Sequence, residues 1–221
     1  MTDPEARPSY TIRAVTDHGQ EGPGAPPWAD IAPLAISHYL WLANGYAPRV
    51  EARLCWSPTF LYVRFRVEEK RVRVRYTRFQ DPVYKDSCVE FFIDAFPTAR
   101  KGYVNFETNA AGTLLAAFGP DRSNRAPLWP EDLAGFQAES TIPGPVDGEY
   151  GAEAWTVAYR VPLGLFRKLY GRDIPPGHRA AANFYKCGDE TETPHYGAWS
   201  RVGTPTPDFH RPEFFGEVVF G

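Results

Sequence analysis

Apolar and polar residues alternate along many short stretches of this chain, and a period of two predicts β-strands rather than helices. The clearest stretches are Arg49–Trp56 and Leu61–Glu68, which flank a short Ser-Pro-Thr turn. Two alternating stretches joined by a short turn predict a β-hairpin. Charged residues dominate the second parity of both stretches, so we expect a sheet with one face on a core and the other in water.

Similar patterns predict further strands at 10–15, 87–96, 103–109, 113–118, 136–142, 153–161, 179–186 and 213–220. Residues 72–78 extend the hairpin in this interpretation, and 32–42 fit either a strand or a turn of helix. Pro162–Tyr170 is the best helical candidate, because proline suits a helix start and Gly171 a helix end. Many short strands with one short helix predict an all-β fold, a single-domain antiparallel β-sandwich of the immunoglobulin or jelly-roll kind.

Proline is abundant, at 22 of 221 residues, and it concentrates between the predicted strands. We therefore expect long Pro-rich loops, with residues 1–27 as an irregular lead-in and 28–221 as the sandwich domain. The longest loop is Cys187–Pro212. Loops of this length inside a compact domain are usually functional or disordered, and the aromatic content of this one argues against disorder.

Charge and cysteine usage exclude several classes of protein. The formal net charge is −3, without the clustered Lys and Arg that nucleic-acid binding needs. No apolar run approaches the roughly 20 residues of a membrane span, and no apolar segment near Met1 resembles a secretory signal. Cys55, Cys88 and Cys187 have no zinc-ligand spacing, so buried, reduced thiols are expected. These features predict a cytoplasmic protein, or an extracellular one if a leader was removed.

Polar side chains gather in two neighbouring predicted strands. In 87–96 the apolar Val89, Phe91 and Ile93 share one parity, which leaves Glu90 on the other. In 103–109 one parity carries Asn105, Glu107 and Asn109. Such a row is either a solvated strand face, as most charged residues are, or the polar side of a ligand site.

Aromatic loop residues beside such a row are typical of a carbohydrate site. The C–H face of a pyranose packs on an aromatic ring, and its hydroxyls need planar donors and acceptors. The candidates are three aromatic residues and five polar ones: Tyr84, Trp199 and Phe209, with Glu90, Asn105, Glu107, Asn109 and Asn183. The alternative for each aromatic residue is a loop anchor at the margin of the core.

The segments VYKDSCVEFFID, YVNFETNAAG, ANFYKCGDETETPHYGAWS and PDFHRPEFFGEVVF together resemble the family 9 carbohydrate-binding modules, and most of all their free-standing members. The resemblance runs from about Trp28 to Phe220. It implies a β-sandwich that binds mono- or oligosaccharides in carbohydrate catabolism. Modules of this family carried by xylanases hold the reducing-end sugar between two tryptophans. The matching positions here are Tyr84 and Phe209, and the sugar-contacting carboxylate of the family matches Glu90.

The resemblance also implies structural calcium. Asp94, Glu107 and Asp189 offer oxygen ligands, but no EF-hand-like spacing is present. We predict no other cofactor, and the sequence carries no signal for a particular oligomeric state.

Three hypotheses for function follow. The first is non-catalytic binding of a mono- or oligosaccharide. The second is a hydrolase acting on O-glycosyl bonds, with Glu90 paired with Glu107 or Asp86, because a glycosidase needs two carboxyl groups about 5–9.5 Å apart. The third is an interaction protein with a vestigial sugar site, since both family tryptophans are replaced.

Overall fold

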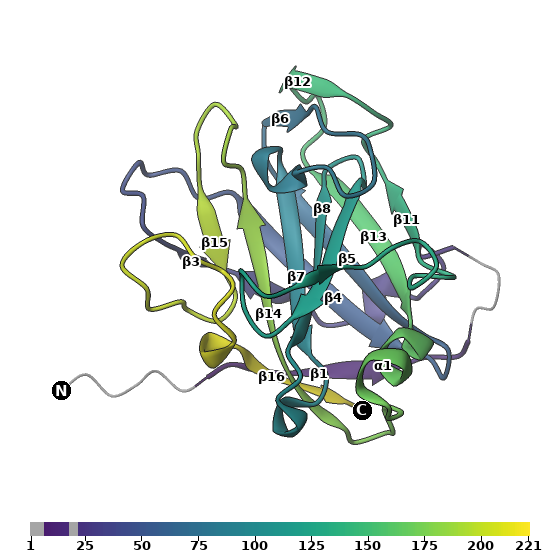
Figure 1. Cartoon of the computed structure of the whole chain (residues 1–221). Coiled ribbons are helices and arrows are strands. Elements are labelled where there is room, and N and C mark those ends of the chain that lie inside the picture. The colour runs from purple at the N-terminus through teal and green to yellow at the C-terminus, as the bar shows by residue number, and fades with distance from the viewer. Residues whose placement is uncertain (1–6, 18–21) are drawn as a thin grey trace.

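The computed structural model describes residues 7–17 and 22–221 and shows two β-sheets folded face to face (Figure 1). The first sheet has the strand order β10–β9–β8–β7–β14–β16–β1, and the second has the order β1–β4–β5–β13–β11. The mostly-β sandwich predicted from the sequence is confirmed. In the described part of the chain one α-helix, α1 (Leu163–Tyr170), accompanies it.

The strands of the first sheet are β7 (Cys88–Asp94), β8 (Tyr103–Asn109), β9 (Leu114–Gly119), β10 (Ala126–Pro127), β14 (Arg179–Cys187) and β16 (Gly216–Phe220). Those of the second are β4 (Arg49–Trp56), β5 (Phe60–Glu68), β11 (Gln137–Ser140) and β13 (Trp155–Pro162), with β2 (Leu34–Ile36) beside β4. The short β3 (His38–Tyr39) pairs with β15 (Tyr196–Ala198), which pairs in turn with β14. The segment 32–42, open from sequence, therefore forms two strands.

β1 (Ser9–Ala14) joins the two sheets. Ser9 to Ile12 pair in parallel with β16, and Arg13 and Ala14 pair in parallel with β4. The sandwich is thus not antiparallel throughout. The described part of the expected irregular lead-in contains a strand that belongs to both sheets.

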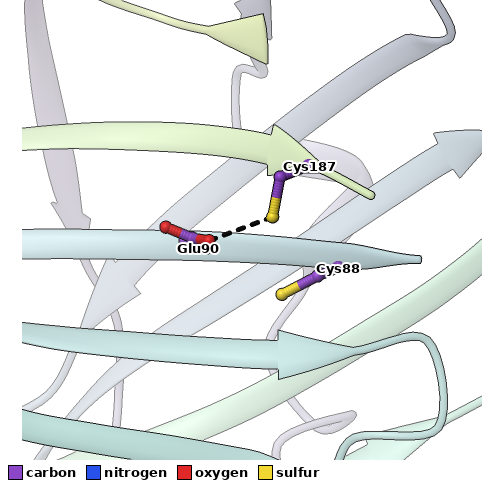
Figure 2. Close-up of side chains that lie close together, drawn as sticks. All are labelled: Cys88, Glu90 and Cys187. Carbon is purple, nitrogen blue, oxygen red and sulfur yellow. Dashed lines mark hydrogen bonds between the residues drawn. The ribbon is translucent and has the colours of Figure 1, made fainter. Parts of the chain in front are cut away.

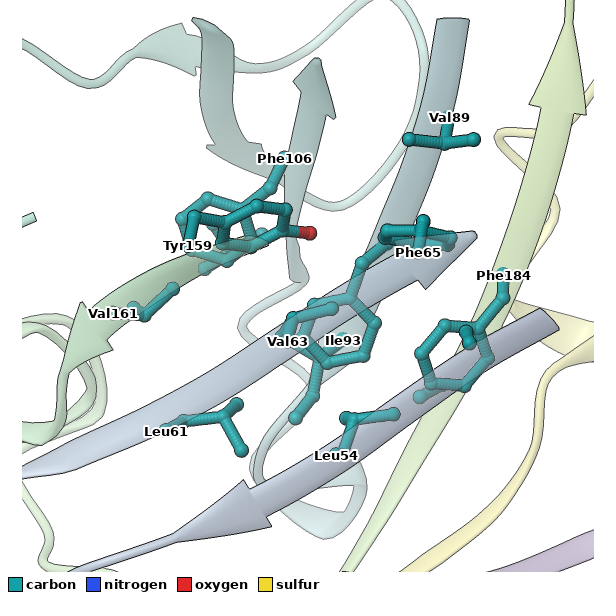
Figure 3. Close-up of a cluster of buried hydrophobic side chains, with 14 of the residues drawn as sticks. Leu54, Leu61, Val63, Phe65, Val89, Ile93, Phe106, Tyr159, Val161 and Phe184 are labelled. Carbon is teal, nitrogen blue, oxygen red and sulfur yellow. The ribbon is translucent and has the colours of Figure 1, made fainter. Parts of the chain in front are cut away.

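The main core lies between the sheets and is built from the inward parity of each strand (Figure 3). Phe91 on β7 stacks on Phe184 of β14 with ring centroids 4.9 Å apart, and Phe65 on β5 reaches the same cluster from the second sheet. The hairpin β4–β5 follows the predicted parity, since Leu54 and Val63 are fully buried. Alternation is a local signal, which is why it located these strands so well.

The outer face of the first sheet is also buried, so of the two alternatives for the polar row of β7 and β8 the solvated strand face does not hold. A second apolar cluster containing Phe92, Tyr103, Tyr185 and Phe215 covers this face. Long loops, including much of 187–212, supply its outer layer, with Val202 and Phe209 as examples. The polar side chains of β7 and β8 therefore lie beneath loops rather than in water.

One proline- and glycine-rich segment contains more structure than predicted. The expected turn 143–151 holds β12 (Val146–Glu149), which pairs with β6 (Arg71–Val74) at the top of the view in Figure 1. The helix α1 ends at Gly171, as predicted. Gly171 caps the helix with a left-handed φ of 74°, and its N–H donates a hydrogen bond to the Arg167 carbonyl oxygen. No helix in the described ranges is long and apolar enough to cross a membrane.

Candidate functional site

A pocket of about 290 Å³ opens on the outer face of the first sheet. Its wall combines aromatic rings with charged groups. The lining residues are Trp41, Tyr84, Tyr196 and Phe209, with Glu90, Glu107, Arg122, Arg125, Asp189 and Asp208, and with Cys187, Pro207 and His210.

Strand register builds the floor of the pocket. Glu90 on β7 lies directly opposite Glu107 on β8 and opposite Tyr185 on β14. One step along the same face, Cys88 lies opposite Cys187. Side chains opposite each other in an antiparallel pair have Cβ atoms about 4.5–5.5 Å apart, so the two carboxyl groups are neighbours.

Burial dominates the electrostatics of the two glutamates. It raises the pKa of Glu90 well above its ordinary value, and the neighbouring Glu107 raises it further. It raises the pKa of Glu107 to about 7, although Arg125 and the Asn105 side chain act in the opposite direction. Asn105 Nδ2 donates to Glu107 Oε1 at 3.0 Å, and the Cys187 thiol donates to Glu90 Oε1 at 3.0 Å. The floor therefore presents carboxyl groups that can both accept and donate hydrogen bonds near neutral pH.

One side wall is cationic. Arg125 Nη1 lies 4.0 Å from Glu107 Oε1 and 2.7 Å from His210 Nδ1. Burial, assisted by Arg125, lowers the pKa of His210 to about 2, so this imidazole is neutral. Arg122 Nη2 bonds Asp208 at 2.9 Å, which ties the loop after β9 to the long loop.

The other side wall is aromatic. Phe209 stacks on Tyr185 with centroids 4.0 Å apart and packs against Trp41 at 5.6 Å. The indole N–H of Trp41 donates a hydrogen bond to the Thr204 carbonyl oxygen at 2.7 Å, which holds the ring in place. Tyr84 lies in the 3₁₀ turn Val83–Lys85 and is half-buried, so part of its ring faces the pocket.

The structure brings together four of the eight residues predicted for a ligand site: Tyr84, Glu90, Glu107 and Phe209 line this pocket. Their roles toward a ligand stay predictions. Asn105 is fully buried and reaches the site only through its bond to Glu107.

The other three predicted residues are buried outside the pocket lining, and each holds the main chain or the core. Asn109 donates to the Tyr76 carbonyl at 2.7 Å and to Asp86 Oδ2 at 3.0 Å. Asn183 donates to the Ser200 carbonyl and accepts the Ser200 N–H, both at 2.9 Å, which fastens the long loop to β14. Trp199 packs edge-on against Phe184 in the main core. The structure therefore does not bring these three side chains into the pocket, and each is engaged in contacts within the protein.

Sequence reasoning missed several lining residues. The aromatic richness of 187–212 is the signal for Tyr196 and His210, but it does not distinguish which aromatic residues of that loop face a ligand. Trp41 comes from 32–42, whose pattern fits either a strand or a turn of helix, and Arg122 and Arg125 come from a predicted loop. Their placement depends on tertiary contacts, so no local pattern could have found them.

The structure also bears on metal binding. Of the three oxygen donors considered for calcium, Glu107 and Asp189 line the pocket, whereas Asp94 Oδ1 accepts the Phe96 N–H and does not line it. These three groups do not form a calcium-type oxygen cage. Among the described residues, Cys88, Glu90 and Cys187 bring potential ligand atoms within 4.8 Å of one another (Figure 2). No local sequence pattern predicts this cluster, because its two cysteines meet only across neighbouring strands.

Comparison with known proteins identifies the family to which this fold belongs. The model of carbohydrate-binding family 9 matches residues 27–220. A solved structure of a candidate carbohydrate-binding protein from Bacteroides uniformis ATCC 8492 is 29% identical, with a TM-score of 0.87, over 98% of this chain and 100% of that one. No curated protein matches.

Two further solved structures that are similar to this chain show a family 9 carbohydrate-binding module from Caldicellulosiruptor kristjanssonii with a bound sugar. The complex with glucose is 13% identical, with a TM-score of 0.62, over 97% of this chain and 96% of that one. The complex with cellotriose is 11% identical, with a TM-score of 0.63, over 96% and 93%. At this identity the likeness shows the shared fold.

Proposed function

Because the chain belongs to carbohydrate-binding family 9, we propose that its pocket binds a mono- or oligosaccharide without cleaving it. The observation that carries the proposal is the composition of the wall, where aromatic rings lie beside a floor of paired carboxyl groups. The Caldicellulosiruptor module binds glucose and cellotriose, which supports a sugar of this kind as the ligand.

The geometry assigns a part to each wall. The half-buried ring of Tyr84 and the indole of Trp41 are surfaces for the C–H face of a pyranose. Glu90 and Glu107 accept hydrogen bonds from the sugar hydroxyls. Arg125 donates hydrogen bonds to the hydroxyl oxygens. The volume of about 290 Å³ lies at the small end of the roughly 300–1,000 Å³ typical of ligand pockets. It suits a terminal sugar unit better than the middle of a long chain.

The placement of the glutamates favours binding over hydrolysis. The carboxyl groups of a glycosidase lie on either side of the scissile bond. Glu90 and Glu107 instead lie next to each other in the pocket floor, on adjacent strands. Both therefore reach the same side of a bound sugar, where they can hold hydroxyls.

The test is calorimetric titration of the reduced protein with a panel of mono- and oligosaccharides, in EDTA, with the same samples assayed for new reducing ends. We expect saturable, millimolar or tighter binding, since a few contacts must offset the cost of association. Tyr84→Ala should weaken binding about tenfold, because one aromatic contact contributes about 0.5–1.5 kcal/mol beyond its buried area. Phe209→Ala is a poor test, since its ring stacks on Tyr185 and supports the fold.

Phe79→Ala is the matched control, because Phe79 is an exposed aromatic residue outside the pocket lining. It should leave the affinity unchanged. The proposal is contradicted if no sugar binds to the wild-type protein, or if both variants lose affinity equally. New reducing ends that disappear in Glu90→Gln would instead assign the protein to the glycosidases.

A further inference from the structure

Two thiols and a carboxyl group converge at the edge of the pocket floor. Cys88 on β7 lies opposite Cys187 on β14, and Glu90 follows two positions along β7 on the same face (Figure 2). The thiol of Cys187 donates to Glu90 Oε1 at 3.0 Å, and the three potential ligand atoms lie within 4.8 Å of one another. All three side chains are buried, with exposures of 0% to 3%.

We propose that Cys88, Glu90 and Cys187 form a binding site for one thiophilic divalent cation such as Zn²⁺. Thiolates select zinc and similar soft ions over calcium and magnesium, which take oxygen ligands. In a tetrahedral site with Zn–S bonds of about 2.3 Å, the sulfur atoms lie ~3.8 Å apart. Since the ligand atoms lie within 4.8 Å of one another, the sulfur atoms need to approach by at most about 1 Å, within reach of small side-chain rotations.

The strands hold the ligands in place before any ion binds. Cys88 and Glu90 share one strand, and Cys187 is on its hydrogen-bonded neighbour, so the backbone fixes their spacing. Cys187 and Glu90 line the pocket, whereas Cys88 does not. The cluster is thus closed on one side and open on the other, and a bound ion presents its fourth position to the pocket. Water or an oxygen of a pocket ligand can fill that position.

The charges around the cluster favour a cation. Glu90, Glu107, Asp189 and Asp208 all line the pocket. Against these four carboxyl groups stand Arg122, which bonds Asp208, and Arg125, which lies 4.0 Å from Glu107 Oε1; within the described residues no Lys, Arg or His forms a salt bridge with Glu90. A divalent ion supplies the missing counter-charge.

Binding must displace protons, and this sets its pH dependence. Two thiols and, where it is protonated, the Glu90 carboxyl release up to three protons to the solvent as the ion binds. No electron transfer is involved. Because the ion binds thiolates rather than thiols, the affinity for metal should increase as the pH rises.

The experiment titrates reduced, EDTA-treated protein with Co²⁺ and Zn²⁺. We expect one ion per chain by native mass spectrometry and a thiolate-to-Co²⁺ charge-transfer band in the near ultraviolet. X-ray absorption of the zinc form should show two sulfur neighbours at about 2.3 Å. Cys88→Ser and Cys187→Ser should each remove most of the band and weaken binding at least about tenfold, since even the loss of a hydrogen-bond partner of a metal ligand costs about 10–100-fold in affinity.

Cys55→Ser is the matched control, because Cys55 is an equally buried free thiol on β4, outside the cluster. It should keep the band. If either cluster variant fails to fold, the X-ray absorption of the wild-type protein decides. A zinc spectrum without sulfur neighbours, or a band that survives both cluster substitutions, overturns the proposal. Sugar titrations in EDTA test the carbohydrate proposal separately, so the two can fail independently.

Discussion

Glu90 and Glu107 show how a single register pair sets the chemistry of the pocket. Each carboxyl group is almost fully buried, and each lies beside the other. Two buried neighbouring carboxylates repel and are poorly solvated, so the pair keeps a proton near neutral pH. A neutral carboxyl group can donate to a sugar oxygen as well as accept from a hydroxyl. The pair therefore offers a ligand both kinds of hydrogen bond.

We predict that the titration of Glu107 contributes a fall in the free energy of unfolding as the pH rises from 5 to 8, opposite in sign to the contribution of His210, whose folded pKa is lowered. The pKa of Glu107 is about 7 in the folded protein against an ordinary 4.5. A raised folded-state pKa gives stability that is fully present below the unfolded pKa and is lost as the pH passes the folded one. The loss for this group is about 2 kcal/mol.

Urea denaturation at several pH values measures this loss. Glu107→Gln should remove the contribution of this group to the pH dependence and stabilise the protein at pH 8 relative to wild type, while the exposed Glu131→Gln should do neither. An unchanged slope in Glu107→Gln would show that other groups carry the pH dependence.

Part of this site was predictable from individual residues. Strand parity placed Glu90 and Glu107 on one face, and the family resemblance pointed to Tyr84 and Phe209 as its walls. Asn183 was indistinguishable from a ligand-binding residue in the sequence. An amide that fastens a loop and an amide that holds a sugar offer the same donors and acceptors, and only the position of Ser200 separates the two roles.

At the scale of elements, β1 has more influence on the fold than its length suggests. Its alternation was visible in the sequence, but its partners were not, because parallel pairing with β16 joins segments about 200 residues apart. Ser9 to Ile12 of β1 pair with β16 and its last two residues pair with β4, so β1 forms the seam, the edge at which the two sheets are joined. Strands inside Pro/Gly-rich segments, such as β12, could not be predicted because the local turn signals there are stronger than the alternating pattern of the strand.

We predict that Ile12→Ala lowers the free energy of unfolding by about 3 kcal/mol. Ile12 is the buried residue of β1 and belongs to the main core, so truncation leaves a cavity at the seam. Its neighbour Thr11 is exposed on the same strand, and Thr11→Ala should change the stability by less than about 0.5 kcal/mol. Chemical denaturation compares the two. Similar small losses in both variants would mean that the seam contributes little to the fold.

At the scale of the whole molecule, the first sheet is buried on both faces. The outer face of this sheet holds the pocket beneath the loops, and its inner face packs against the second sheet. The two sheets are joined by more than apolar contacts. Lys186 on β14 points inward and reaches Glu69, which directly follows β5, with Nζ and Oε2 3.3 Å apart. Trp155 on β13 adds an N–H bond to the same carboxylate at 3.2 Å. A buried ion pair thus links the two sheets.

We predict that Lys186→Met lowers the free energy of unfolding by about 3–5 kcal/mol. The substitution leaves Glu69 buried, with an exposure of 1%, and without its cation. Adding Glu69→Gln should recover most of the loss, since the uncompensated charge is then removed. The exposed pair Arg179–Glu217 is the matched control, and Arg179→Met should cost less than about 1 kcal/mol because water screens that pair. A double-mutant cycle by urea denaturation measures the coupling of each pair. If Lys186→Met costs no more than Arg179→Met, packing alone holds the sheets together at this point.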